Sequence, residues 1–324
     1  MLQRAKRIAW PYWSQARRSW NKARMRLRGG FHNGRGIVRY RDGARGNHLI
    51  KELIAADAPL MIARYGDIEL KAIWSFLSSA PPEEQKRRVD ALHRSAGFFP
   101  PDLENLSRFV EIYEHAARRL DCLAIWNFEQ GRWEMEERMF RDYSPGASLV
   151  SIRSLESWLF ADPWTASLRG RKVLVIHPFE ESIRRQYAKR AWLFVDELVL
   201  PEFGRIDTLK AVQSIAGNPT EFATWFDALE SMRAQIADRD FDVALIGAGA
   251  YGFPLAAFVK DLGKKAVHMG GVTQILFGII GSRWEKVIPG GYPPLTRFVN
   301  ANWTRPLPEE TPDRFETVDG GAYW

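Results

Sequence analysis

Two carboxylates one residue apart, Asp67 and Glu69, follow an apolar run that ends in Arg64-Tyr65-Gly66. In an extended chain, residues two apart point to the same side, whereas on a helix they lie roughly 200° apart. If Gly66 ends a strand and the next residues stay extended, both carboxylates converge on one cation. Proteins commonly hold Mg²⁺ or Mn²⁺ with one or two carboxylates and substrate phosphates. We therefore predict a divalent-metal site at Asp67 and Glu69; the alternative is a pair of acids that stabilises a helix N-terminus.

A glycine-rich loop forms the second candidate, because residues 247–252 read GAGAYG between a strand-like and a helix-like segment. Backbone N–H groups at such a junction bind phosphate. A nicotinamide site needs an acid at the end of the next strand to hold the ribose, but residues 268–271 read HMGG. The pattern favours a nucleotide or phosphate over a nicotinamide or flavin, and close packing of the glycines is a further alternative.

A third loop begins with His177-Pro178, directly after the apolar run 172–176. Ligands bind at the carboxyl ends of parallel strands, so His177 is expected either to contact phosphate or to act as an acid or base. A hydrogen-bonded structural histidine is an equal alternative. Walker, zincin, cysteine-zinc and G-x-S-x-G motifs are all missing from the sequence.

The charge of this 324-residue chain is unevenly distributed. Residues 1–46 hold 13 of the 46 Lys and Arg but one of the 39 acids, a net charge of +12, so the remainder carries −5. A mildly acidic body argues against nucleic-acid binding, and we expect no specific nucleic-acid partner. The single cysteine, Cys122, excludes an internal disulfide and suits a reducing compartment.

The basic segment 1–46 is the predicted membrane-facing part of the chain. Trp10, Tyr12, Trp13 and Trp20 lie among its arginines, a pattern that suits an anionic membrane surface. A solvated extension or an arm for RNA or another acidic partner are the alternatives. The arm lacks the apolar core of a signal peptide, and the uncharged stretch 243–259 is short and interrupted by glycines. We expect a cytoplasmic protein, peripheral on the inner face of the cytoplasmic membrane.

Short apolar runs separated by helical patterns predict an α/β fold: Rossmann-like, with a mainly parallel sheet flanked by helices. The expected organisation is a basic arm at 1–46, one large domain at 47–304 and an irregular tail at 305–324. The clearest helix is predicted at 219–238, with Asn218 as N-cap and Pro219 in the first position. The predicted core strands are 60–65, 122–126, 148–152, 172–176, 197–200, 242–246 and 265–269.

These segments also resemble a known family. Residues 63–70, ARYGDIEL, resemble the metal-binding segment of the GT-D-type glycosyltransferases, bacterial enzymes with a Rossmann-like fold and an Asp-x-Glu motif. The carboxyl half is similar to an uncharacterised branch of that group found among polysaccharide-biosynthesis genes. The resemblance covers residues 47–324, and its other segments are VLVIHPF at 173–179, residues 246–254, HMGGVTQ at 268–274, LFG at 276–278 and the terminal GAYW.

The resemblance implies a glycosyltransferase dependent on Mn²⁺ or Mg²⁺, with Asp67 and Glu69 as the catalytic metal ligands. It would move a sugar from a nucleotide-diphosphate donor to a polysaccharide, glycolipid or protein-glycan acceptor. The alternatives are a non-catalytic nucleotide-sugar or partner-binding protein of a polysaccharide assembly system, and a nicotinamide-dependent oxidoreductase that uses residues 247–252. The residues expected to bind the nucleotide-sugar are Arg64, Gly66, His177, Gly247, Gly249, Tyr251, Gly252, Gly270 and Gly271.

Overall fold

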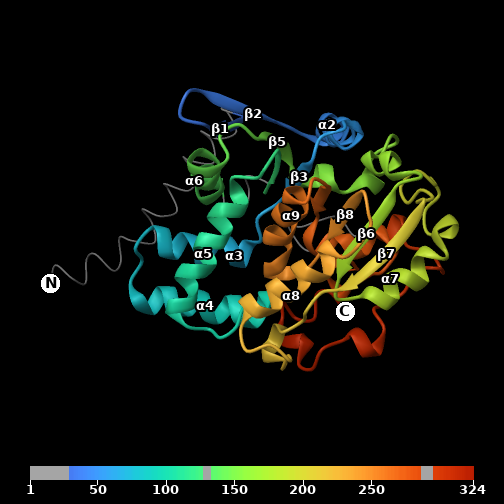
Figure 1. Cartoon of the computed structure of the whole chain (residues 1–324). Coiled ribbons are helices and arrows are strands. Elements are labelled where there is room, and N and C mark those ends of the chain that lie inside the picture. The colour runs from blue at the N-terminus through green and yellow to red at the C-terminus, as the bar shows by residue number, and fades with distance from the viewer. Residues whose placement is uncertain (1–28, 127–132, 286–294) are drawn as a thin grey trace.

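The computed structural model describes residues 29–126, 133–285 and 295–324 (Figure 1). Within these residues one sheet has nine strands, in the spatial order β1-β2-β5-β4-β3-β9-β8-β6-β7. β1 pairs with β2 in the antiparallel sense and the other paired neighbours are parallel. The strands are β1 (Gly30–His32), β2 (Ile37–Arg41), β3 (Leu60–Ala63), β4 (Cys122–Ile125), β5 (Ser148–Ser151), β6 (Lys172–His177), β7 (Arg205–Lys210), β8 (Val243–Ile246) and β9 (Lys265–His268).

Helices cover both faces of the sheet, as right-handed crossovers between parallel strands require. Alternate residues of β3 enter separate cores: Met61 and Ala63 belong to one, Leu60 and Ile62 to the other. The first face carries α3 (Asp67–Leu77), α4 (Pro82–Ala96), α5 (Leu103–Ala117), α6 (Trp133–Tyr143), α8 (Trp225–Ala237) and α9 (Gly252–Asp261). The second carries α2 (Gly43–Ala55), α7 (Glu180–Tyr187) and α10 (Thr273–Leu276).

The predicted α/β class with a mainly parallel sheet in a single domain is confirmed. The prediction of a strand at 197–200 was wrong. This stretch turns, and Asp196 Oδ1 accepts the Leu198 N–H at 2.9 Å. The helix predicted at 219–238 begins later, at Trp225, because Thr224 and Asp227 form a reciprocal capping box that fixes its start.

The N-terminal boundary also differs from the prediction. β1 and β2 join the sheet and α2 begins at Gly43, so the folded domain includes residues assigned to the arm. The aromatic and basic residues predicted to meet a membrane, at 4–28, lie outside the described residues. Across the part of the chain that is described, no helix combines the length and apolar character needed to cross a bilayer.

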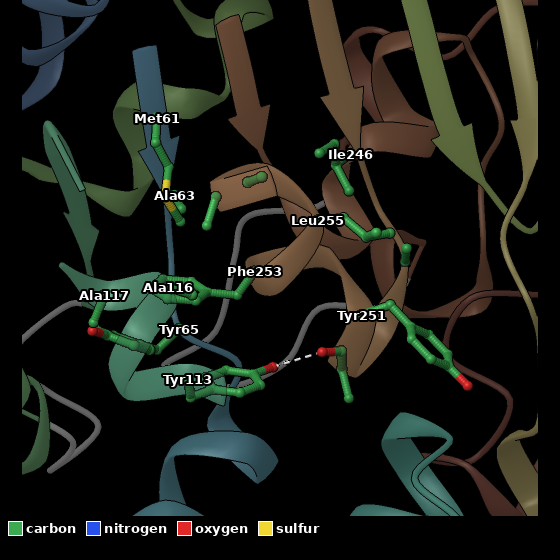
Figure 2. Packing of buried hydrophobic residues seen from close by; sticks show 14 of the residues in the cluster. Met61, Ala63, Tyr65, Tyr113, Ala116, Ala117, Ile246, Tyr251, Phe253 and Leu255 are labelled. Atoms are coloured by element: carbon green, nitrogen blue, oxygen red, sulfur yellow. Dashed lines mark hydrogen bonds between the residues drawn. The ribbon is translucent and has the colours of Figure 1, made fainter. Parts of the chain in front are cut away.

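Three stacked rings fix the start of α9 against β3 and α5. Phe253 lies between Tyr65 and Tyr113, with ring centroids 4.6 Å and 5.4 Å away (Figure 2). The Tyr113 hydroxyl donates to the carbonyl of Ala250 at 2.8 Å, a bond drawn in the same view. These ring contacts and the bond to Ala250 attach the glycine-rich loop before α9 to α5 and to the segment after β3.

Candidate functional site

The predicted loops follow four adjacent strands, β3, β9, β8 and β6, whose carboxyl ends share one edge of the sheet. After β3 the chain passes into α3 on the first face, and after β9 it passes into α10 on the second. Adjacent strands that diverge to opposite faces leave a crevice between them, which is where open α/β sheets bind ligands. Because β8 leads to α9 on the first face and β6 to α7 on the second, the topology places the candidate site at the carboxyl ends of β3, β9, β8 and β6.

Arg64, which follows β3, packs against the loop that follows β9. A β-carbon built on Gly270, whose φ is +67°, would lie 2.4 Å from Arg64 Nη1, so the arginine packs directly on this glycine. The guanidinium carbon lies 4.5 Å from the centroid of the Trp126 ring. The Arg64 Nε atom is buried and has no hydrogen-bond partner among the described residues. A partly exposed cation with a spare donor thus sits at the switch point.

Gly247 continues the contact toward β6. A β-carbon there would meet His177 Cδ2 at 2.6 Å and the Gly270 carbonyl oxygen at 2.7 Å. The structure therefore brings four of the predicted residues, Arg64, Gly270, Gly247 and His177, into one contiguous series of contacts.

His177 is buried, and burial lowers the pKa of its ring to about 3. Its Nδ1 accepts the Phe179 backbone N–H at 3.0 Å, which leaves the ring proton of the neutral form on Nε2. A ring with this pKa is neutral at physiological pH and is a weak base. The hydrogen-bonded arrangement agrees with the structural alternative, while Nε2–H remains available as a donor.

The remaining glycines of the GAGAYG loop also lie against protein atoms. Gly249 has a φ of +51° and its β-carbon would lie 3.0 Å from the Ala96 carbonyl, while at Gly252 it would lie 2.3 Å from His268 Nε2. Close packing alone thus accounts for the choice of glycine at these positions. Tyr251 lies in the core, stacked on Trp225 with centroids 5.0 Å apart, and in Figure 2 it points away from Tyr113.

The extended conformation expected for residues 67–69 is wrong. α3 begins at Asp67, with Gly66 as its N-cap in an extended conformation (ψ 146°). Asp67 and Glu69 therefore occupy the first and third helical positions, where carboxylates interact favourably with the helix dipole. Leu70 and Ile73 are buried along the same helix, so the segment is helical from Asp67 onward.

Glu69 nevertheless does not splay away from Asp67, because its side chain folds back toward the helix start. A β-carbon on Gly66 would lie 1.8 Å from Glu69 Oε2, so the carboxylate covers the glycine. The pKa of Glu69 is raised, mainly by burial and to a smaller extent by the charge of Asp67. A bond to its own backbone N–H and the charge of Arg64 oppose this rise. The two acids thus interact electrostatically despite the helical geometry.

Asp67 is more accessible than Glu69, and its Oδ2 lies 2.8 Å from Lys71 Nζ, one helical turn away. In the described ranges no group of three or more His, Cys, Asp or Glu is arranged to hold a metal ion. Two neighbouring carboxylates fit a cation that takes its other ligands from water and substrate phosphate, as Mg²⁺ and Mn²⁺ do.

The C-terminal tail contributes residues that the sequence did not single out. The Tyr323 ring occupies the space above Gly271, where a β-carbon would lie 2.3 Å from Cε1, and its carbonyl accepts from Gln274 Nε2 at 3.1 Å. Glu310 caps the start of α7, accepting the N–H of Glu181 at 2.7 Å. The tail therefore packs along the same edge of the sheet as the crevice.

No protein-family model matches the sequence, and no curated protein is found as a relative. Three solved structures are similar to this chain at low identity. One, described as a domain of unknown function 1792 with a distinct glycosyltransferase fold, has a TM-score of 0.44 and 12% identity, covering 84% of this chain and 92% of its own. A second structure of that domain has a TM-score of 0.43 and 13% identity, and the match covers 84% of this chain and 92% of that chain. A third, described as a new glycosyltransferase from Streptococcus sanguinis, has a TM-score of 0.38 and 11% identity. That match covers 84% of this chain and 96% of that chain.

Proposed function

We propose that this chain is a glycosyltransferase that takes a sugar from a nucleotide-diphosphate donor, with Mn²⁺ or Mg²⁺ as cofactor. The observation that carries the proposal is the series of contacts from Arg64 through Gly270 and Gly247 to His177. It runs along the switch-point crevice, beside the first turn of α3. The Asp-x-Glu resemblance of residues 63–70 supports the same reaction class.

Arg64 is the proposed diphosphate contact. Guanidinium groups bind phosphate oxygens through two parallel N–H bonds, and these charge-assisted bonds are about twice as strong as neutral ones. Stacking on Trp126 holds the guanidinium plane in place before the donor arrives. Gly270 permits this position, since any side chain there would collide with Arg64.

Asp67 and Glu69 are the proposed ligands of the divalent cation. When bound, the cation would neutralise charge that develops on the departing nucleoside diphosphate. Glu69 would bind it as a carboxylate, the form whose charge burial opposes and the charge of Arg64 favours. Lys71 would release Asp67 from the present ion pair and could then approach a phosphate oxygen.

His177 is proposed as a hydrogen-bond donor to the donor substrate. Its pKa of about 3 makes it a poor general base, whereas Nε2–H can donate to a phosphate oxygen or a sugar hydroxyl. The fixed bond from Phe179 to Nδ1 keeps the ring in that tautomer.

Nicotinamide chemistry is disfavoured by the end of β9. The ribose of such cofactors is held by an acid at this position, and here the strand ends in His268, buried against Gly252. The acceptor is proposed to be a glycan or a lipid-linked saccharide.

The test is a panel of nucleotide-diphosphate sugars assayed for nucleotide release with Mn²⁺, with wild type compared with Asp67→Asn. We expect turnover with at least one donor, its loss on chelation of the metal, and a large loss in the variant. Donor binding by calorimetry without turnover would instead identify a nucleotide-sugar-binding protein. Neither binding nor turnover with any donor would refute both readings of the crevice.

A further inference from the structure

β2 and β7 lie at opposite ends of the sheet (Figure 1), and one side of β2 carries exposed basic residues. Along this strand Val38 and Tyr40 pack against the core, whereas Ile37, Arg39 and Arg41 are exposed. This alternation follows from the two-residue period of a strand. Arg35, before the strand, and Arg45, in the first turn of α2, are exposed as well. We call this surface the β2 face: Arg35, Ile37, Arg39, Arg41 and Arg45.

The arginines of the β2 face have no ion-pair partner within the described ranges, which is also true of exposed arginines elsewhere such as Arg94 and Arg297. Among the described residues, none of their four guanidinium groups takes part in an ion pair or hydrogen bond. Several arginines elsewhere are paired, among them Arg87 with Glu84, Arg185 with Glu181 and Arg205 with Asp240. Unpaired guanidinium groups on one side of a strand keep their charge available to an external anionic surface.

We propose that the β2 face docks the folded domain onto an anionic lipid membrane. Ile37, which is 39% exposed, lies among the arginines, and an apolar side chain surrounded by cations suits the boundary between headgroups and acyl chains. The sequence immediately before β1 has the same character, since residues 1–28 contain nine Lys or Arg, three Trp and no acid. The remaining body is net acidic, which disfavours a nucleic acid lying across it.

This orientation is independent of the proposed function, because the β2 face shares no residue with the crevice. It makes one end of the sheet the membrane-facing side and leaves the β7 end in solution. The opposite end has its own exposed apolar residues, Trp192 and Val195, which are 63% and 109% exposed. They provide an internal comparison for the experiment.

The first experiment is vesicle co-sedimentation of the full chain with neutral phosphatidylcholine and with vesicles containing phosphatidylglycerol. The variant Arg35→Gln, Arg39→Gln, Arg41→Gln is compared with Arg87→Gln, Arg185→Gln, Arg205→Gln, which removes equal charge from other surfaces. We expect the first triple variant to bind the anionic vesicles about 100-fold more weakly than wild type, and the second less than about 5-fold. Equal losses in the two variants, or no loss in the first, would overturn the proposal.

A second experiment locates the contact itself. Cys122 is buried, and burial raises the pKa of its thiol to about 12, so a new surface cysteine can be labelled selectively. An environment-sensitive dye is attached to Ile37→Cys or to Val195→Cys in the full chain. We expect bromolipid quenching at position 37 and none at 195. Quenching at 195 alone or at neither position would refute the β2 face, as would a dye at 37 that responds to poly(U) but not to vesicles.

Discussion

The helices α3 and α7 begin at the same edge of the sheet and have similar first turns. Each follows a buried parallel strand and a short loop, and each carries two acids at its start: Asp67 and Glu69 in α3, Glu180 and Glu181 in α7. From composition alone, both are equally good places for a charged ligand. They differ in the origin of the carboxylate that lies over the helix start.

In α7 that carboxylate comes from a distant part of the chain. Glu310, 6% exposed, accepts the backbone N–H groups of Glu181 and Ser182 and also bonds the Ser182 hydroxyl. Glu181 pairs outward with Arg185. The start of α7 is therefore closed by a tertiary contact that holds the C-terminal tail in place.

In α3 the carboxylate comes from the first turn itself, because Glu69 folds back over Gly66. Moving it requires only side-chain rotation and no displacement of a chain segment. A helix start closed by a distant segment is suited to stability, whereas one covered by its own flexible acid can exchange that acid for a ligand. This difference assigns the structural role to α7 and the proposed ligand role to α3.

The largest expected effect tests whether the starts of α3 and α7 are equally closed to water. His177 precedes α7 and His268 lies behind the crevice, and burial lowers both pKa values to about 3; the charge of Arg64 contributes at His268. The unfolded chain binds these two protons below about pH 6.5, so stability falls as pH decreases from 6.5 toward 3. Each histidine should remove about 1.4 kcal/mol per pH unit, or about 5 kcal/mol for the pair at pH 4.5.

Urea denaturation at several pH values measures this loss. His177→Gln and His268→Gln should each reduce the pH dependence by about half of the histidine contribution. If acid sensitivity is unaltered in both buried variants, the two regions are open to solvent and the comparison fails.

The next effect separates the two helix starts by activity. Asp67 and Glu180 both occupy the first helical position, so Asp67→Asn and Glu180→Gln remove the same charge from equivalent sites. We expect Asp67→Asn to lower sugar-transfer turnover by about 100-fold or more, the size typical of a lost charge-stabilising contact. Glu180→Gln should stay within about 2-fold of wild type. Similar losses in the two variants would show that the reaction does not distinguish α3 from α7.

The same comparison shows what the sequence could predict. Strands buried on both faces, such as β3, β4 and β8, are short continuous apolar runs and were found. β7 was missed because its sequence, RIDTLK, is charged at both ends, as suits a strand at the sheet edge. The pairing of β3 with β9, which forms the crevice, joins segments about 200 residues apart and has no local signal.

The candidate site was predicted in part for the same reason. Loops that follow buried strands are visible in sequence, so Arg64, His177 and Gly247 were identified. The role of Glu310 was not identified, because the residues that it contacts, Glu181 and Ser182, lie 129 and 128 positions earlier in the sequence. Lys71 could have been found, since it is four residues from Asp67 on the helical pattern.

A smaller effect contrasts the two covering carboxylates in stability. Glu310→Gln should lower the free energy of unfolding by about 2 kcal/mol, because buried N–H groups lose a charged acceptor. Glu69→Gln should change it by less than about 0.5 kcal/mol, since burial raises the pKa of Glu69 and so offsets part of what its charge contributes. Denaturant titration measures both, with the exposed Glu309→Gln as control. The reverse order would make Glu69 the structural residue.

The smallest expected effect concerns the residue under each carboxylate. The N-cap of α7 is Phe179, whereas the N-cap of α3 is Gly66. Gly66→Ala is compatible with the backbone (φ −69°), but its β-carbon would force Glu69 outward. Because a flexible side chain can move, we expect a loss of less than about 1 kcal/mol. Exposed to water, Glu69 should show a pKa closer to its ordinary value in a carbon-13 NMR titration.

Gly247→Ala is the contrast, since there the β-carbon meets the Gly270 carbonyl and the loss of stability should be about 1–3 kcal/mol. An unchanged Glu69 pKa in Gly66→Ala would mean that its carboxylate does not cover the start of α3 in solution.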